Sequence, residues 1–145
     1  MKVLLQRVNS ASVEVEKEIV GQISKGVLLF LGIGKNDIGE EIEWLTDKIV
    51  NMRIFEEGEK CFDKSLIDVG GEALVVSQFT LCGACERGRR PDFFAAAEPF
   101  RAKELYERFV QTLKDKGVTV ATGQFGAYMK VKLENDGPVT FLLEK

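Results

Sequence analysis

Histidine is absent from the chain of 145 residues. This absence excludes every mechanism that needs an imidazole, including Ser-His-Asp and Cys-His relays and a His-ligated zinc. No side chain then has an ordinary pKa close to neutral. Catalysis by this chain must use a base from outside the protein, shift the pKa of a carboxylate or lysine, or act through electrostatic stabilisation.

Cysteine and long apolar runs are also scarce. The three cysteines are Cys61, Cys82 and Cys85, a small odd number that argues against a disulfide framework and fits a reducing compartment. The longest apolar stretch, 27–31, is far too short to span a bilayer, and the N-terminal residues lack the pattern of a signal peptide. We therefore expect a cytoplasmic protein with no membrane partner.

The residues that are present indicate one globular domain over 1–145, because 45% are hydrophobic and 30% are charged. The formal net charge of -3 gives no global attraction for nucleic acid. A local basic cluster nevertheless exists at Arg87, Arg89 and Arg90. It is either a contact for phosphates or the solvated charge of a loop.

Apolar and polar residues alternate over 2–8, 12–16 and 19–23, which predicts antiparallel strands with one solvent-exposed face. The continuous apolar stretch 27–33 predicts a central strand buried on both faces, and 73–76 reads as a second such strand. Arg7 lies on the apolar side of its strand, so it either extends to solvent at a sheet edge, which is the default, or holds a backbone group in a polar site.

Two helices are predicted from apolar stripes. The first begins at Asp37, with Glu40 as its capping-box partner, and the second begins at Pro99 and ends near Gly117, after a short helical piece over 93–97. Extended pieces over 118–121, 127–134 and 139–143 complete the chain. The fold class is therefore α+β, a mainly antiparallel, curved or barrel-like β-sheet with two principal helices packed on it.

The segment Ser77-Gln78-Phe79-Thr80-Leu81 follows the second buried strand. A strand held on both faces fixes the hydroxyls and backbone N–H groups at its exit, which preorganises a site. The alternative is a strand that simply ends in a polar turn. Similarly, Asn135-Asp136-Gly137-Pro138 reads as an ordinary hairpin turn joining the last two strands, although its proline removes an N–H and admits a cis bond.

These two segments together resemble the paired signature of the D-aminoacyl-tRNA deacylase family. Further likeness, in order and spacing, lies in Gln6-Arg7-Val8 with Ala11-Ser12-Val13, Asn51-Met52-Arg53-Ile54-Phe55, Gly88-Arg89-Arg90-Pro91 and 122–129, so it covers essentially the whole chain. Asp92 stands where the family often has serine, and aspartate caps a helix as well as serine does.

The resemblance implies a homodimer that hydrolyses the ester between a D-amino acid and the terminal adenosine of tRNA, as chiral proofreading, and that also cleaves glycyl-tRNA. It implies a cis Gly137-Pro138 bond that reaches into the partner's pocket and excludes L side chains, with Arg7 and Met129 supporting it. Arg87, Arg89 and Arg90 would contact the tRNA. No cofactor or metal is implied.

For the chemistry, Phe79 N–H with help from Thr80 is the first choice as oxyanion donor, while the 2′-hydroxyl of the substrate assists attack by water. Ser77 and Gln78 would shape the pocket. Thr80 as a nucleophile ranks second, since no histidine, adjacent lysine or N-terminal amine is evident to activate it. Two other classes remain open: a zinc or redox module built on Cys82 and Cys85, and a tRNA-binding barrel without catalysis.

Overall fold

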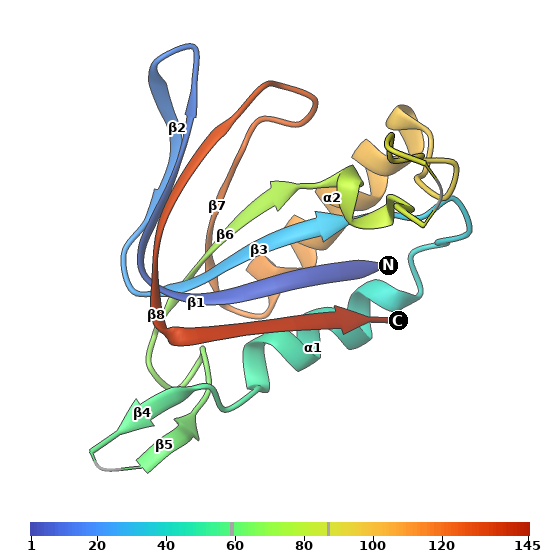
Figure 1. Ribbon diagram of the computed structural model, residues 1–145. Coiled ribbons are helices and arrows are strands. Elements are labelled where there is room, and N and C mark those ends of the chain that lie inside the picture. Colours follow the sequence, from blue (N-terminus) through green and yellow to red (C-terminus); the bar gives the residue numbers. More distant parts are fainter. Residues whose placement is uncertain (59, 87) are drawn as a thin grey trace.

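The computed structural model describes residues 1–58, 60–86 and 88–145. Its main sheet has the strand order β2-β1-β3-β6-β7, with β8 paired to β1 (Figure 1). The strands of this sheet are β1 (Lys2–Val15), β2 (Glu18–Ile23), β3 (Gly26–Gly32), β6 (Glu72–Ser77), β7 (Thr119–Thr122) and β8 (Lys130–Glu144). A separate hairpin consists of β4 (Phe55–Glu57) and β5 (Lys60–Lys64).

The long strand β1 makes the sheet curl. Its first half pairs with β3 and its second half with β2, while β8 pairs along nearly its whole length, all antiparallel. The pairs β3–β6 and β6–β7 are parallel. At the far edge β2 comes back to β7, because a Cβ placed on Gly21 would lie 2.3 Å from the carbonyl oxygen of Thr122. The sheet is therefore a nearly closed barrel, which confirms the predicted fold class.

Strands β3 and β6 are buried on both faces, as their continuous apolar sequences predict. One face carries Leu29 and Val75 into a core shared with the helices α1 (Glu41–Asn51) and α2 (Pro99–Asp115). The opposite face carries Leu28 and Leu74 into a second core inside the barrel. The prediction that 27–33 forms a central strand is confirmed.

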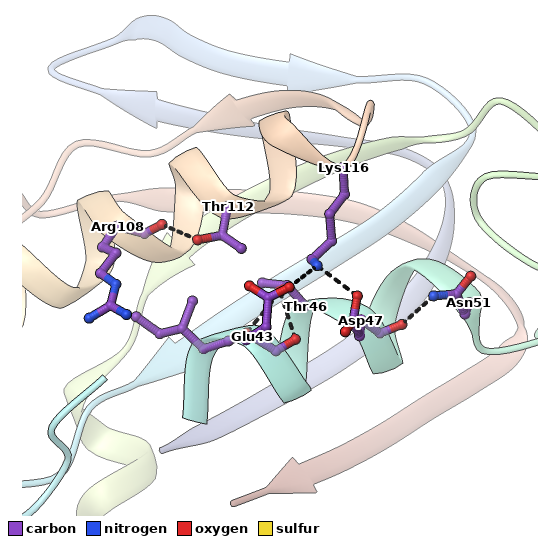
Figure 2. A network of polar contacts seen from close by, with 8 residues as sticks. Glu43, Thr46, Asp47, Asn51, Arg108, Thr112 and Lys116 are labelled. Atoms are coloured by element: carbon purple, nitrogen blue, oxygen red, sulfur yellow. Dashed lines mark hydrogen bonds and ion pairs between the residues drawn. The ribbon is translucent and has the colours of Figure 1, made fainter. Parts of the chain in front are cut away.

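The helices α1 and α2 are joined at one end by a cluster of polar contacts (Figure 2). Lys116, at the C-cap of α2, donates to Glu43 at 2.5 Å and to Asp47 at 2.6 Å, both on α1. These two hydrogen bonds raise the pKa of Lys116. Within α1, the buried Thr46 hydroxyl donates to the carbonyl of Ile42 at 2.8 Å, so it is satisfied within its own helix.

Two predictions about helix boundaries are wrong. The first helix begins at Glu41 and not at Asp37, because Gly39 has φ +93, a conformation outside the α-helix, and because the Asp37 carboxylate accepts the Gly34 N–H at 2.7 Å. Glu40 occupies the N-cap without a side-chain hydrogen bond. The piece 93–97 is a turn, since Ala96 N–H donates to the Phe93 carbonyl at 2.9 Å and the backbone of Ala95 and Ala97 then bonds to the segment 33–35. The start of the second helix at Pro99 is confirmed.

The prediction of a hairpin turn at 135–138 is also wrong. Both flanking pieces belong to β8 and pair with the same strand β1, so the chain does not reverse. Thr140 pairs with Gln6 and Asn135 pairs with Val8, which leaves residues 136–139 opposite Arg7 alone. The segment 136–139 is therefore a bulge, called here the 136–139 bulge. Its Gly137-Pro138 peptide bond is cis, and both residues are exposed.

Candidate active site

A pocket of about 480 Å³ opens at the end of the barrel where β3 and β6 finish. Its floor includes Leu31 of β3 and Val76 of β6, and its walls come from segments 96–102 and 125–131. Three of the predicted catalytic residues line it, namely Ser77, Gln78 and Phe79. The pocket is largely apolar, with its polar groups concentrated at the end of β6.

The exit of β6 is held rigidly. Gln78 N–H donates to the carbonyl of Leu31 at 2.8 Å, which ties the exit to β3. Phe79 then begins a short 3₁₀ helix, η1 (Phe79–Cys82), whose first bond runs from Leu81 N–H to the Gln78 carbonyl. Among the residues that the structure describes, the N–H groups of Phe79 and Thr80 have no acceptor. The backbone therefore presents two free donors at the end of a fixed strand.

Thr80 lies beside the pocket and does not line it. Its side chain is exposed, and its hydroxyl oxygen accepts a hydrogen bond from the Gln78 side-chain amide. The Phe79 ring, 58% exposed, packs edge-on against Phe93 with 4.9 Å between ring centroids. In the described part of the chain, no carboxylate or amine contacts the Thr80 hydroxyl. The contacts thus give Thr80 no base.

The second wall of the pocket comes from the loop before β8. Met129 lines it, with its sulfur against Gly123, where a Cβ would lie 2.6 Å from Sδ. Phe125 packs on Tyr106 of α2 with 5.7 Å between ring centroids. The Tyr106 hydroxyl donates to the carbonyl of Val75 at 2.8 Å, and burial raises the pKa of Tyr106 to about 12. Tyr106 is one of the buried residues of α2, and its hydroxyl also fixes the strand that carries the site.

Arg7 and the 136–139 bulge lie at the opposite end of the barrel from the pocket. The start of β3 pairs with Val8, and Val8 also pairs with Asn135, whereas Leu31 at the end of β3 pairs with Ser77. In Figure 1 the bend in β8 lies near β4, far from η1. Gly137-Pro138 therefore cannot enter the pocket of its own chain.

Arg7 is buried, with 4% of its surface exposed, so the default interpretation of a side chain at a sheet edge is wrong. Its Nη1 donates to the carbonyl of Ile54 at 2.6 Å, and its Nε donates to the carbonyl of Asp136 at 3.0 Å. Ion pairs join it to the Asp136 carboxylate at 3.1 Å and to Glu56 at 3.6 Å. The alternative interpretation, that Arg7 holds backbone groups, agrees with these contacts. The contact with the Asp136 carbonyl anchors the bulge.

Arg89 and Arg90 are exposed on the loop that the Ala84–Asp92 bridge closes, and Arg87 lies outside the described residues. Three exposed aromatic side chains, missed by the sequence analysis, lie in the segments that surround the pocket: Phe94, Phe100 and Tyr128 are each at least 85% exposed. Phe100 falls outside the apolar stripe of its helix, and from this position its exposure could have been predicted.

The two cysteines Cys82 and Cys85 lie in different surroundings. Cys82 is buried and Cys85 is exposed, and both thiols are free. Burial raises the pKa of the Cys82 thiol, which disfavours the thiolate that metal binding or redox exchange needs. Within residues 1–58, 60–86 and 88–145, no group of three or more His, Cys, Asp or Glu side chains is placed to hold a metal. Over the same ranges, no helix is both long enough and apolar enough to cross a membrane.

The fold and the pocket define the structural class of the protein, which is a small α+β barrel with a preorganised site at the end of its parallel strands. Comparison with known proteins defines the family. The family model described as D-Tyr-tRNA(Tyr) deacylase matches residues 4–144, so the chain belongs to this family.

Individual relatives agree with this assignment. The chain is 54% identical over 144 residues to the D-aminoacyl-tRNA deacylase of Clostridioides difficile, with 99% of this chain and 97% of the relative covered. It is 53% identical over 145 residues to the protein of the same name from Thermosipho melanesiensis, with the same coverage. Both matches span nearly the full length of each chain.

Two solved structures share the fold. A c-Myc DNA unwinding element binding protein matches with a TM-score of 0.92 at 41% identity, covering 100% of this chain and 99% of that one. A probable eukaryotic D-amino acid tRNA deacylase matches with a TM-score of 0.86 at 19% identity, covering 98% and 97%. The second likeness shows the fold alone.

Proposed function

We propose that this protein hydrolyses the ester bond of D-aminoacyl-tRNA, releasing the D-amino acid and the tRNA, in the cytoplasm where aminoacyl-tRNA is used. The observation that carries the proposal is the family match over residues 4–144, together with relatives of that activity at more than 50% identity. The absence of histidine is compatible with it. An aminoacyl ester is already activated, so orientation and stabilisation of the oxyanion suffice.

In the proposed reaction the Phe79 N–H, with help from the adjoining Thr80, stabilises the oxyanion that forms on the ester carbonyl. Water attacks this carbonyl with assistance from the substrate's own 2′-hydroxyl, and the 3′-oxygen of the ribose leaves with a proton. The free N–H groups at the exit of β6 support the donor role. The Thr80 hydroxyl oxygen accepts a hydrogen bond from Gln78, and no base lies beside it among the described residues. Both observations support ranking Thr80 second, as a nucleophile, behind the oxyanion mechanism.

Selection of the D enantiomer is proposed to require a second copy of the chain. The 136–139 bulge of one subunit would enter the pocket of the other, where the carbonyl oxygens of Gly137 and Pro138 exclude an L side chain and Met129 supports them. Gly137 and Pro138 are exposed, Arg7 holds the bulge through the Asp136 carbonyl, and the bulge cannot reach its own pocket. Glycine has no side chain to exclude, so glycyl-tRNA would also be cleaved.

The tRNA is proposed to cross the loop that carries Arg87, Arg89 and Arg90. Arg89 and Arg90 are exposed and suit phosphate contacts, and the exposed aromatic rings around the pocket suit unpaired bases at the end of an RNA. With a net charge of -3, the molecule as a whole does not attract nucleic acid, so binding would depend on this local surface.

The test offers matched D- and L-tyrosyl-tRNA to the purified protein and follows deacylation of each. The proposal expects release of D-tyrosine at a rate far above that of L-tyrosine. Equal consumption of both, or of neither, contradicts it. Stoichiometric zinc in the purified protein without esterase activity would instead favour the cysteine-based binding module, and tight binding of aminoacyl-tRNA without turnover would favour a non-catalytic barrel.

The shared site has its own test. A variant with a filled pocket, Ala127→Trp, and a variant with an altered bulge, Gly137→Trp, should each be inactive or unselective alone. When the two variants are co-expressed, some dimers contain one subunit of each kind. In such a dimer the intact bulge of the Ala127→Trp subunit enters the intact pocket of the Gly137→Trp subunit, so selective activity should return. If mixing restores nothing while the mixed dimer is demonstrably formed, the bulge does not act across subunits.

A further inference from the structure

The side chain of Asn135 closes the 136–139 bulge from within β8. Its Oδ1 accepts the Val139 N–H at 2.9 Å, and its Nδ2 donates to the Thr140 hydroxyl oxygen at 2.9 Å. The same hydroxyl oxygen also accepts a hydrogen bond from the Gln6 side chain at 3.3 Å. One asparagine therefore bridges the two ends of the bulge and links them to β1.

These bonds replace the pairing that the strand lacks here. Residues 136–139 have no Cα partner on β1, and Pro138 has no N–H, so the first donor after the proline is the Val139 N–H. Val139 is 7% exposed, and a donor at such a position is destabilising when it is left unpaired. Arg7 holds the N-terminal side of the bulge through the Asp136 carbonyl, and Asn135 holds the C-terminal side.

The space around Gly137 shows how closely the bulge is confined. A Cβ at this position would lie 2.8 Å from Cγ2 of Val139 and 3.1 Å from Nη2 of Arg7, and its φ is +127. The two side chains beside Gly137 are therefore that of Arg7, which anchors the bulge through the Asp136 carbonyl, and that of Val139, whose N–H Asn135 anchors. A shift of either anchor moves the carbonyl oxygens of the bulge.

We propose that Asn135 is a positioning residue for the choice between D and L substrates, because it fixes the direction of the bulge carbonyls. This inference rests on the proposed function, in which those carbonyls exclude an L side chain in the partner's pocket. A filter made of main-chain atoms discriminates only while its position is fixed, since a displacement of about 1 Å opens room for the excluded group. Loss of the two hydrogen bonds of Asn135 should therefore admit L substrates before it slows the reaction with D substrates.

The experiment compares four variants with the wild type for kcat/KM on D- and L-tyrosyl-tRNA. Asn135→Ala removes both bonds of the asparagine, and Asn135→Asp keeps the acceptor for Val139 N–H. Thr140→Val keeps the bond to Val139 N–H but removes the acceptor for Asn135 Nδ2 and for the Gln6 side chain. The matched control is Asn9→Ala. Asn9 is an exposed asparagine on β1 whose side-chain amide also donates at 2.9 Å, to Glu134 of β8, just outside the bulge.

The inference expects Asn135→Ala to lower the D-to-L ratio of kcat/KM about tenfold, which corresponds to the net contribution of about 1.4 kcal/mol from the lost bonds. Asn135→Asp should retain most of the selectivity, Thr140→Val should fall between, and Asn9→Ala should match the wild type. Amide exchange at Val139, followed by NMR, should accelerate in Asn135→Ala and stay slow in Asn135→Asp.

A folded Asn135→Ala that keeps the wild-type ratio overturns the inference while leaving the proposed function intact. Parallel losses of both activities with an unchanged ratio also overturn it, because they would show a purely structural role. If Asn135→Ala does not fold, an unchanged D-to-L ratio in Thr140→Val overturns it, because that variant is expected to lower the ratio. Equal cleavage of D and L substrates by the wild type overturns the proposed function and the inference together.

Discussion

Substitution of Arg7 by methionine should destabilise the fold by about 3–5 kcal/mol. Two of its hydrogen bonds reach backbone carbonyls, that of Ile54 at 2.6 Å and that of Asp136 at 3.0 Å. Hydrogen bonds from a charged donor contribute about 1.5–3 kcal/mol each, and methionine fills the volume of the aliphatic stem without replacing either donor. The ion pairs to Asp136 and Glu56 add little, because these carboxylates are 38% and 57% exposed.

The assay is urea unfolding at a fixed protein concentration, with thermal unfolding as a second readout, because self-association would make either value depend on concentration. For a chain of this length each kcal/mol shifts the midpoint by about 2–4 °C, so Arg7→Met should unfold about 10 °C below the wild type. Arg7→Lys keeps the charge and one donor direction, and it should lose about half as much.

The matched control is Arg101→Met. This arginine is half-exposed and bonds to Glu104 at 2.8 Å and to the Ile38 carbonyl at 3.3 Å, so its replacement should cost less than about 1 kcal/mol. The reasoning is refuted if Arg7→Met is folded and lies within 1 kcal/mol of the wild type. That result would mean that the carbonyls of Ile54 and Asp136 obtain other donors when the guanidinium is removed.

Three further predictions concern catalysis, RNA binding and pH. Thr80→Ala should retain substantial deacylase activity, measured as kcat/KM on D-tyrosyl-tRNA, because the backbone supplies the oxyanion donor; total loss with an intact fold would favour covalent catalysis. Replacing Arg89 and Arg90 by alanine should weaken tRNA binding and flatten its salt dependence while sparing small ester substrates, and an unchanged tRNA affinity would remove these arginines from the interface. Tyr106→Phe should cost about 1 kcal/mol at neutral pH through the lost bond to the Val75 carbonyl. The pKa of Tyr106 is raised from 10.0 to about 12 in the fold, so the native state binds its proton more tightly; the stability this provides is present below pH 10 and falls between pH 10 and 12. Lys116, whose pKa is also raised, acts in the same direction, so alkaline unfolding should be less steep in Tyr106→Phe and in Lys116→Met than in the wild type.

The local pattern predicted the elements whose environment is uniform along their length. Strands β3 and β6 lie between two cores, so every position is apolar and the sequence shows a continuous run. Helix α2 presents one face to the sheet, and its stripe with Pro99 at the start gives the correct boundaries. The likeness of the two signature segments to a known family was also present in the residues themselves.

The 136–139 bulge shows where local pattern is insufficient. Asn, Asp and Gly favour the same backbone conformations in a hairpin turn and in a bulge, so the composition of the segment cannot distinguish them. The difference is whether the flanking strands pair with each other or with β1, which lies more than 120 residues away in the chain. Arg7 was misplaced for the same reason, because its partners Ile54 and Asp136 come from distant segments.

By itself, the amino-acid sequence determined the fold class, the two buried strands, the exclusion of imidazole chemistry and the segment 77–79 that reaches the pocket. Only the tertiary structure placed Met129 beside Phe79 in one pocket, buried Arg7 against two backbone carbonyls, and set Gly137-Pro138 at the opposite end of the barrel. The physical reason is the range of the interactions. Side-chain periodicity and backbone preference act over a few residues, whereas strand pairing and buried hydrogen bonds depend on which distant segments meet.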